Sequence, residues 1–335
     1  MPKPRLAQFF AAALACVFGI VQSAEAQELQ LQSLWQQGLD LADEHLADYG
    51  YEVDREALAG VPRLNEALQF LDGVDDALEN GTLEQLAQMK PTVEASIQWL
   101  EQWPAAEPYT AWLRQQMDYF DVAEESVAES RDVPAQTVPP PRPLSLPPAP
   151  APASPTAHKK AEQTARSAAM WEKRMAHRAA PSGAAALVPK LKPIFRKSGL
   201  PEELVWLAEV ESGFKPHARS PVGAVGLFQF MAPTARRFGL NPERPDERLD
   251  PEKSASAAAA YLRILHRRFG SWPLALAAYN AGEGRVSKAL KTAQVSSFEE
   301  IADILPLETR MYVPKIDAVI QKREGTRLTQ LPAPR

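Results

Sequence analysis

Apolar side chains recur every three to four residues along most of the chain after residue 26, which is the spacing of one face of a helix. In the first half, four groups carry this pattern: Leu31, Leu34, Leu39, Leu41 and Leu46; Leu64, Leu68, Phe70 and Leu71 behind Pro62; Leu83, Leu86, Val93, Ile97 and Leu100; and the stretch from Tyr109 to about Val127. In the second half, helices are predicted from about residue 161 to 322, with breaks at Gly199-Leu200-Pro201, Pro216, 241–251, Gly270, Gly282 and Pro306. No stretch alternates as a strand would, so we expect an all-α (mainly α) fold.

The first 26 residues have the pattern of a secretory signal peptide. Lys3 and Arg5 form a basic start, an apolar run follows over residues 9–21, and Ala24-Glu25-Ala26 offers a cleavage site. The run is short for a membrane-spanning helix, although an uncleaved signal anchor is an alternative. We therefore expect an exported protein of the periplasm or cell envelope. Leu14-Ala15-Cys16 loosely resembles a lipoprotein signal, so membrane association is expected only if Cys16, the single cysteine, is lipidated.

A proline-rich stretch divides the chain. Ten prolines fall between Pro134 and Pro155, and proline lacks the backbone donor that helices and sheets need. This composition predicts an extended linker, with a segment that binds a partner domain as the alternative. The predicted organisation is a signal peptide over residues 1–26, an acidic helical accessory module over 27–130, the linker over 131–160, a helical domain over 161–325 and a tail over 326–335.

Charge divides at the same place. Residues 27–130 hold 22 acidic and 4 basic side chains, whereas residues 131–335 hold 31 basic and 19 acidic ones, so the overall net charge of −5 hides two halves of opposite sign. A basic exported domain suits an anionic polymer. Nucleic acid is the competing partner for such a domain, but export argues against it, and we expect none.

A glutamate near the middle of the second half is the candidate chemical group. Pro201 favours a helix start, and at about 100° per residue Glu211 falls within the apolar face of that helix, at about 340° from Leu204. Glu209 falls at about 140°, on the polar face. A carboxyl group on an apolar face is either paired with a cation or held protonated, and the second state suits a general acid.

The segments around Glu211 carry a family resemblance. They closely resemble the catalytic domain of lytic transglycosylases of the soluble (SLT) and membrane-bound D types, over about residues 171–322. The matching blocks are Glu211-Ser212-Gly213-Phe214-Lys215-Pro216-His217-Ala218-Arg219-Ser220, Gly223-Ala224-Val225-Gly226-Leu227-Phe228-Gln229-Phe230-Met231, Ala278-Tyr279-Asn280-Ala281-Gly282 and Glu308-Thr309-Arg310-Met311-Tyr312-Val313. Phe228 departs from the usual Met or Trp, which would alter stacking in the cleft.

The resemblance implies a lysozyme-like, mainly α fold, a glycan cleft and peptidoglycan as the partner. Glu211 would be the catalytic acid and base. The implied substrate-binding residues are Ser220, Gln229, Met231, Tyr279, Asn280, Glu308 and Tyr312. No metal and no cofactor are implied.

The implied reaction cleaves the β-1,4 bond between MurNAc and GlcNAc without water and leaves a 1,6-anhydro end. One alternative is a lysozyme-type hydrolase (muramidase), which needs a second carboxylate such as Glu308 or Asp246. The other is an inactive wall-binding protein. We find no chemistry in the acidic module itself. The charge split suggests that this module docks on the basic domain and restrains it, while recruitment of a protein partner is an equal alternative.

Overall fold

The structure is a computed structural model, and it describes residues 73–74, 76–101, 107–132, 168–220 and 223–335. The predicted signal peptide, Cys16, the first two predicted helices and most of the proline-rich linker lie outside these residues. The described part is helical and contains no strand, only the isolated bridges Arg219–Val225 and Val225–Phe230. The predicted all-α class is therefore confirmed. No helix within the described ranges has the length and apolar character needed to cross a membrane.

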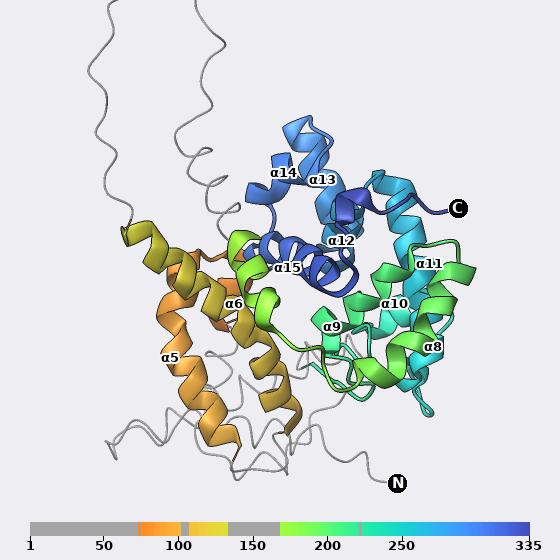
Figure 1. The fold of residues 1–335 in the computed structure, drawn as a ribbon, viewed down its shortest axis with the longest axis horizontal. Coiled ribbons are helices and arrows are strands. Elements are labelled where there is room, and N and C mark those ends of the chain that lie inside the picture. Colours follow the sequence, from red (N-terminus) through yellow and green to blue (C-terminus); the bar gives the residue numbers. More distant parts are fainter. Residues whose placement is uncertain (1–72, 75, 102–106, 133–167, 221–222) are drawn as a thin grey trace, which may run out of the picture.

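The N-terminal part forms a helical hairpin. After a helical stretch over residues 76–80, α5 spans Leu83–Leu100 and α6 spans Glu107–Asp132. These two helices match the third and fourth helices expected from the sequence. They lie side by side at the left of Figure 1. Their buried side chains, among them Leu86, Val93 and Phe120, belong to the same hydrophobic core as the rest of the described chain.

The second half folds into a compact set of helices that begins with a helical stretch over residues 168–177. The α-helices that follow are α8 (Ala184–Lys197), α9 (Leu207–Ser212), α10 (Ala232–Arg237), α11 (Pro251–Phe269), α12 (Trp272–Ala281), α13 (Glu283–Ala293), α14 (Phe298–Ile301) and α15 (Leu307–Glu324). Short 3-10 helices are η2 (Glu202–Trp206), η3 (Glu247–Leu249), η4 (Ala302–Ile304) and η5 (Leu328–Gln330).

Local sequence signals place these boundaries. Asp250 accepts hydrogen bonds from the backbone N–H groups of the first turn of α11, and Pro251 occupies the first helical position, where no donor is needed. Gly270 ends α11 in the left-handed conformation, and Gly282 follows α12. The predicted breaks therefore coincide with observed helix ends.

Helix α12 is the central element because it is apolar on every side. Residues 274–278 are all buried, which is expected only for a helix covered all round. It packs against α11, α13 and α15. Helix α15 lies between this group and the hairpin (Figure 1), so it has one face toward each half of the chain.

Residues 326–335 also join the fold. The Trp272 indole N–H donates to the carbonyl of Pro332 at 3.0 Å, and the backbone N–H of Arg335 donates to the carbonyl of Gly199 at 2.8 Å. Leu328 and Leu331 are buried. This segment, which the sequence sets apart as a tail, covers the outer side of α12 and the end of α8.

Candidate active site

Glu211 lies in the last turn of α9, and the chain reverses directly after it. Gly213 adopts the left-handed conformation, with φ of 59°, and ends the helix. The Ser212 hydroxyl donates to the carbonyl of Leu227 at 2.9 Å. This bond holds the loop over residues 218–230 against the end of α9, so the glutamate and the loop keep a fixed relative position.

The expected placement of Glu209 on a polar, exposed face is wrong. Glu209 is 8% exposed, and its carboxylate pairs with Arg323, which donates at 2.8 Å and 3.0 Å. The segment from Pro201 is not one α-helix, because η2 turns by about 120° per residue before α9 begins. Both sides of α9 are covered by protein, and Arg323 neutralises the charge that burial would otherwise penalise.

The environment of Glu211 favours its neutral form. Its pKa is raised from 4.5 to about 8, chiefly because burial disfavours the carboxylate. A hydrogen bond from the Tyr312 hydroxyl to Oε1 acts in the opposite direction, as does the charge of Lys315, whereas the charge of Glu308 adds to the increase. Glu211 is only partly buried as a whole residue, so it keeps contact with the surface. A carboxyl group in this setting can give up a proton at neutral pH and take one back.

Glu308 joins the site through α12. The Asn280 side-chain amide donates to Oε1 of Glu308 at 3.3 Å, and the Thr309 hydroxyl donates to Oδ1 of Asn280 at 2.6 Å. These bonds fix the orientation of the Asn280 amide. They also connect the end of α12 to the first turn of α15, next to the helix face that carries Tyr312.

Tyr279 connects the site to the loop. Its hydroxyl donates to the carbonyl of Phe228 at 2.7 Å. Burial raises its pKa well above 10, and the charge of Glu211 adds to that increase. Tyr279 therefore stays protonated and acts as a neutral donor within electrostatic range of Glu211.

The remaining predicted residues lie in the loop and mainly support its backbone. The Ser220 hydroxyl accepts the backbone N–H of Ala224 at 2.9 Å. The Gln229 amide donates to the carbonyl of Gly226 at 2.8 Å, and Met231 is the residue that precedes α10. The structure gives none of these three a contact with Glu211. Phe228 does not stack in a cleft, because its side chain is fully buried and its ring lies 5.9 Å from that of Phe195.

One face of α15 organises the site. Glu308, Tyr312 and Lys315 are spaced by four and three residues, so they share a face. The sequence analysis missed Lys315, although this spacing from Glu308 could have revealed it. It also missed two residues of α6: Tyr119, which interacts electrostatically with Glu211, and Asp118, which pairs with Lys315. No sequence pattern places α6 beside α15. Among the described residues, no cluster of three or more His, Cys, Asp or Glu side chains could hold a metal ion.

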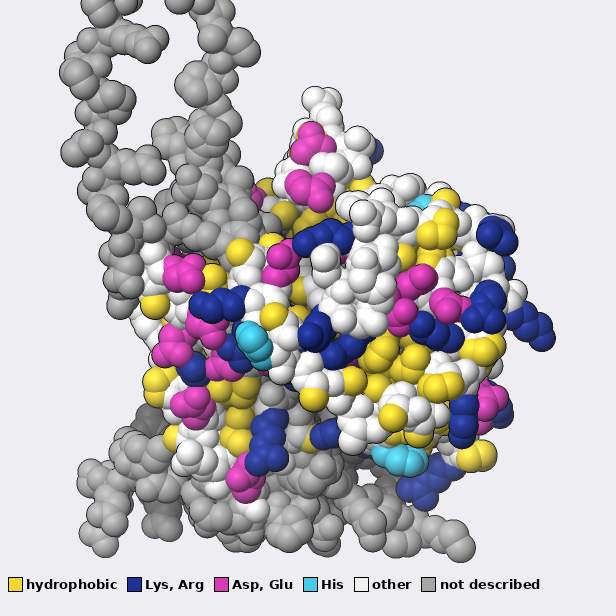
Figure 2. Space-filling view, in the orientation of Figure 1, with side chains coloured by type: hydrophobic (Ala, Val, Ile, Leu, Met, Phe, Trp, Pro, Cys, Tyr) yellow, Lys and Arg dark blue, Asp and Glu magenta, His cyan; other side chains and the backbone are white. Residues whose placement is uncertain are grey.

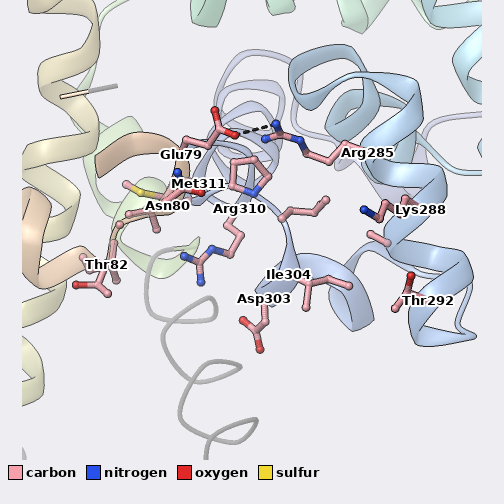
Figure 3. A pocket seen from close by; sticks show the side chains of 16 residues that line it. Glu79, Asn80, Thr82, Arg285, Lys288, Thr292, Asp303, Ile304, Arg310 and Met311 are labelled. Atoms are coloured by element: carbon pink, nitrogen blue, oxygen red, sulfur yellow. Dashed lines mark ion pairs between the residues drawn. The ribbon is translucent and has the colours of Figure 1, made fainter. Parts of the chain in front are cut away.

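A cavity of about 670 Å³ lies on a different face of α15 (Figure 3). Its lining includes Leu307, Arg310 and Met311, which lie between about 60° and 160° around the helix from Glu308 and Tyr312. Across it, Arg285 and Glu79 form an ion pair of 2.8 Å. None of Glu211, Glu308 and Tyr312 lines this cavity, so the geometry separates it from the candidate acid.

Comparison with known proteins indicates which family of domains this part of the chain resembles. Residues 192–302 match the family model described as "Transglycosylase SLT domain". The match contains Glu211, the loop after it and α12, so this part of the chain is similar to transglycosylase SLT domains. Glu308, Tyr312 and Lys315 lie beyond the matched residues.

Individual relatives agree with this class. The chain is 44% identical over 142 residues to membrane-bound lytic murein transglycosylase D of Escherichia coli K12, which is 40% of this chain and 31% of that protein. It is 36% identical over 118 residues to the soluble lytic murein transglycosylase of Salmonella typhimurium, covering 33% of this chain and 18% of that protein. The chain thus spans about a third or less of these relatives.

Among solved structures, the chain is similar to that of the 70-kDa soluble lytic transglycosylase of Escherichia coli. The identity is 19% and the TM-score is 0.37, over 83% of this chain and 57% of that one.

Proposed function

We propose that this protein is a peptidoglycan lytic transglycosylase with Glu211 as its acid and base. The observation that supports this most strongly is the carboxyl group of Glu211, which ends α9 within the SLT domain, accepts the Tyr312 hydrogen bond and has a pKa of about 8. Such a group is protonated at neutral pH without a metal or a second protein acid.

The proposed reaction uses Glu211 twice. Protonated Glu211 donates its proton to the oxygen that links C1 of MurNAc to GlcNAc, and the C1–O bond breaks with its electron pair going to that oxygen. The carbonyl oxygen of the MurNAc N-acetyl group stabilises the positive charge at C1. The Glu211 carboxylate then removes the proton of the C6 hydroxyl, and O6 bonds to C1 to give the 1,6-anhydro ring. Glu211 ends protonated and no water is consumed.

The other predicted residues would position the substrate and the acid. Tyr312 fixes the Oε1 atom of Glu211, so the other carboxyl oxygen is the one that faces the substrate. Asn280 and Glu308 offer polar groups to the sugar on the α15 side. We propose that Ser220, Gln229 and Met231 contact the glycan through the loop, and that Tyr279 holds the loop in place.

The test is mass spectrometry of the products from purified peptidoglycan treated with the protein and with Glu211→Gln. We expect products that lack one water relative to a hydrolysed end, and a loss of at least about 10²–10³-fold in their rate with the variant. Tyr312→Phe serves as a control that keeps the carboxyl group and should retain measurable product. Unchanged activity of Glu211→Gln would contradict the proposal.

A hydrolase of the lysozyme type is the second candidate, because Glu308 lies within electrostatic range of Glu211. Asp246, the other candidate carboxylate, is instead committed to the buried guanidinium of Arg248 at 2.9 Å. Glu308→Gln separates the two reactions: a transglycosylase keeps forming anhydro ends, whereas a hydrolase that depends on Glu308 loses all product. Reducing ends that carry a full water would favour the hydrolase.

The cellular setting remains a proposal. We infer export to the periplasm or cell envelope from residues 1–26 and from the substrate, since peptidoglycan lies outside the cytoplasmic membrane. Separating the envelope and cytoplasmic fractions and sequencing the N-terminus of the purified protein tests this. A mature chain that starts at Gln27 agrees with it, and lipidation at Cys16 would instead indicate a membrane anchor.

A further inference from the structure

A buried lysine joins the two halves of the chain next to Glu211. Lys315 lies on α15 and its side chain is 4% exposed. Its ammonium group is 3.2 Å from Oδ2 of Asp118 in α6. It also lies 4.5 Å from the ring centre of Tyr119 and 4.9 Å from that of Trp171.

These contacts favour the charged form of the lysine and oppose the effect of burial, which on balance lowers its pKa. Burial lowers the pKa of Lys315, and the charge of Asp118 is the largest of the opposing influences. The faces of two aromatic rings stabilise a cation at these distances. The rings are themselves fixed, because Tyr119 and Trp171 meet edge to face with centres 5.7 Å apart. Three segments of the chain therefore enclose one ammonium group.

The enclosed charge faces the candidate acid. Lys315 follows Tyr312 by three residues and Glu308 by seven, so it shares their face of α15. Tyr312 is bonded to Glu211. Electrostatic interactions of Lys315 with both Glu211 and Glu308 agree with this placement.

We propose that the α5–α6 hairpin is a working part of the catalytic centre, because its Asp118 and Tyr119 hold Lys315 as a fixed positive charge beside Glu211 and Glu308. This inference rests on the proposed function and deepens it. Lys315 is a positioning residue that acts through Glu211, and Asp118 acts through Lys315. The hairpin then supports the reaction instead of restraining it.

The positive charge compensates for the negative charges around the acid. When Glu211 has given up its proton, two carboxylates face each other, and Lys315 limits their repulsion. The titratable groups that face Glu211 are Tyr119 of α6, Tyr279 of α12, and Glu308, Tyr312 and Lys315 of α15. Those that face Lys315 are Asp118 and Tyr119 of α6, Arg178 after the 168–177 helix, Glu211 of α9 and Glu308 of α15.

The test is the pH profile of kcat/KM, measured as formation of anhydro product from soluble peptidoglycan fragments by the full chain. The rate falls above the pKa of Glu211, because the acid form is lost. Lys315→Met keeps the length and packing of the side chain without its charge. Since the charge lowers the pKa of Glu211, its removal should move the alkaline limb upward by about 0.5–1 pH unit.

Asp118→Asn tests the role of the hairpin. Without the carboxylate, Lys315 loses its proton at a lower pH, so we expect an upward shift in the same direction as for Lys315→Met. The double variant should shift no further than Lys315→Met alone, because Asp118 acts only through the lysine. It also avoids an uncompensated buried charge, so it remains informative if a single variant folds poorly.

Lys90→Met is the matched control. Lys90 is also a lysine paired with α6, to Asp121 at 2.8 Å and Glu124 at 2.5 Å, but it lies within the hairpin. Its loss should weaken the hairpin and leave the pH profile unchanged. An unchanged profile for Lys315→Met or Asp118→Asn, or an equal shift for Lys90→Met, would overturn the inference. If Glu211→Gln were fully active, the proposed function itself would fail, which is a different result.

Discussion

Glu211 carries a conflict between stability and chemistry. A surface glutamate is ionised at neutral pH, but the surroundings of this one favour the protonated form up to a pKa of about 8. A buried side chain that stayed neutral at all pH values would destabilise the folded protein less than this carboxyl group does when it ionises. The ionised carboxylate therefore destabilises the folded state at alkaline pH, whereas the same raised pKa leaves a transferable proton on Glu211 at neutral pH.

This conflict predicts a pH-dependent gain in stability for Glu211→Gln. Because the folded-state pKa is raised above the unfolded value of about 4.5, the folded state of the native protein becomes less stable as pH rises from about 4.5 to about 8. The variant lacks this loss. Urea unfolding should show similar stability of both proteins at pH 4.5 and an advantage of about 2–4 kcal/mol for the variant at pH 9. Equal stability at both values would mean that Glu211 is solvated.

The sequence selects a candidate acid, and the structure shows which of the other predicted residues lie near it. Apolar periodicity selects Glu211, and the structure brings it together with Tyr312, Glu308 and Tyr279. It does not predict that Glu209 is buried, because the 3-10 turn of η2 changes the phase of the helix and the partner Arg323 lies 114 residues away. A projection along one helix cannot include a neutralising charge from another.

At the scale of elements, the loop over residues 218–230 depends on one close approach. A Cβ atom at Gly226 would lie 2.0 Å from the carbonyl oxygen of Arg248, and the φ of Gly226 is 87°. The guanidinium of Arg248 also donates to the carbonyl of Phe230 at 3.0 Å. The loop and the segment before α11 therefore pack without room for a side chain between them.

We predict that Gly226→Ala destabilises the protein by about 3 kcal/mol or more, because backbone must move. Gly213→Ala is the matched comparison, since its φ of 59° is also positive but nothing lies within 4 Å of the added Cβ. Its cost should be about 1 kcal/mol. Thermal unfolding measures both, and a similar cost for the two variants would mean that the loop adapts to the side chain.

Element boundaries were largely predictable, whereas element contacts were not. Prolines and glycines mark where helices begin and end, as at Pro251 and Gly270. Gly223 and Gly226, close together in the loop, favour a tight backbone. The sequence does not show which segment approaches Gly226. That contact is between residues more than 20 positions apart, and only the folded chain defines it.

At the scale of the molecule, the hairpin docks through both charge and apolar contact. Figure 2 shows acidic and basic side chains interleaved over the region of α6. Arg174 pairs with Asp121 at 2.5 Å and with Glu125 at 2.6 Å, and Gln115 donates to the carbonyl of Val210 at 2.6 Å. The buried side chains of α5 and α6 belong to the shared hydrophobic core.

This docking predicts one cooperative unfolding transition for the described residues, even in 0.5 M salt. Salt screens exposed ion pairs but leaves buried apolar contacts in place. Tryptophan fluorescence and far-UV circular dichroism should therefore give the same midpoint in urea. A separate, earlier transition that appears only at high salt would show that charge alone holds the hairpin.

The charge split of the sequence suggested contact between the halves, but not its location. Opposite net charges favour association without choosing a surface. The choice depends on single groups such as Asp118, whose partner in the second half is 197 positions further along the chain. The predicted domain limits at residues 130 and 160 remain predictions, because most of the linker lies outside the described residues.

The pairing of Asp118 with Lys315 also has a consequence for biosynthesis. A ribosome makes α6 long before α15, and the acid at position 211 emerges between them. Until α15 is complete, Glu211 lacks Tyr312, and the carboxylate of Asp118 lacks its lysine. The surroundings that raise the pKa of Glu211 are therefore complete only after α15 has been made and has packed against α9.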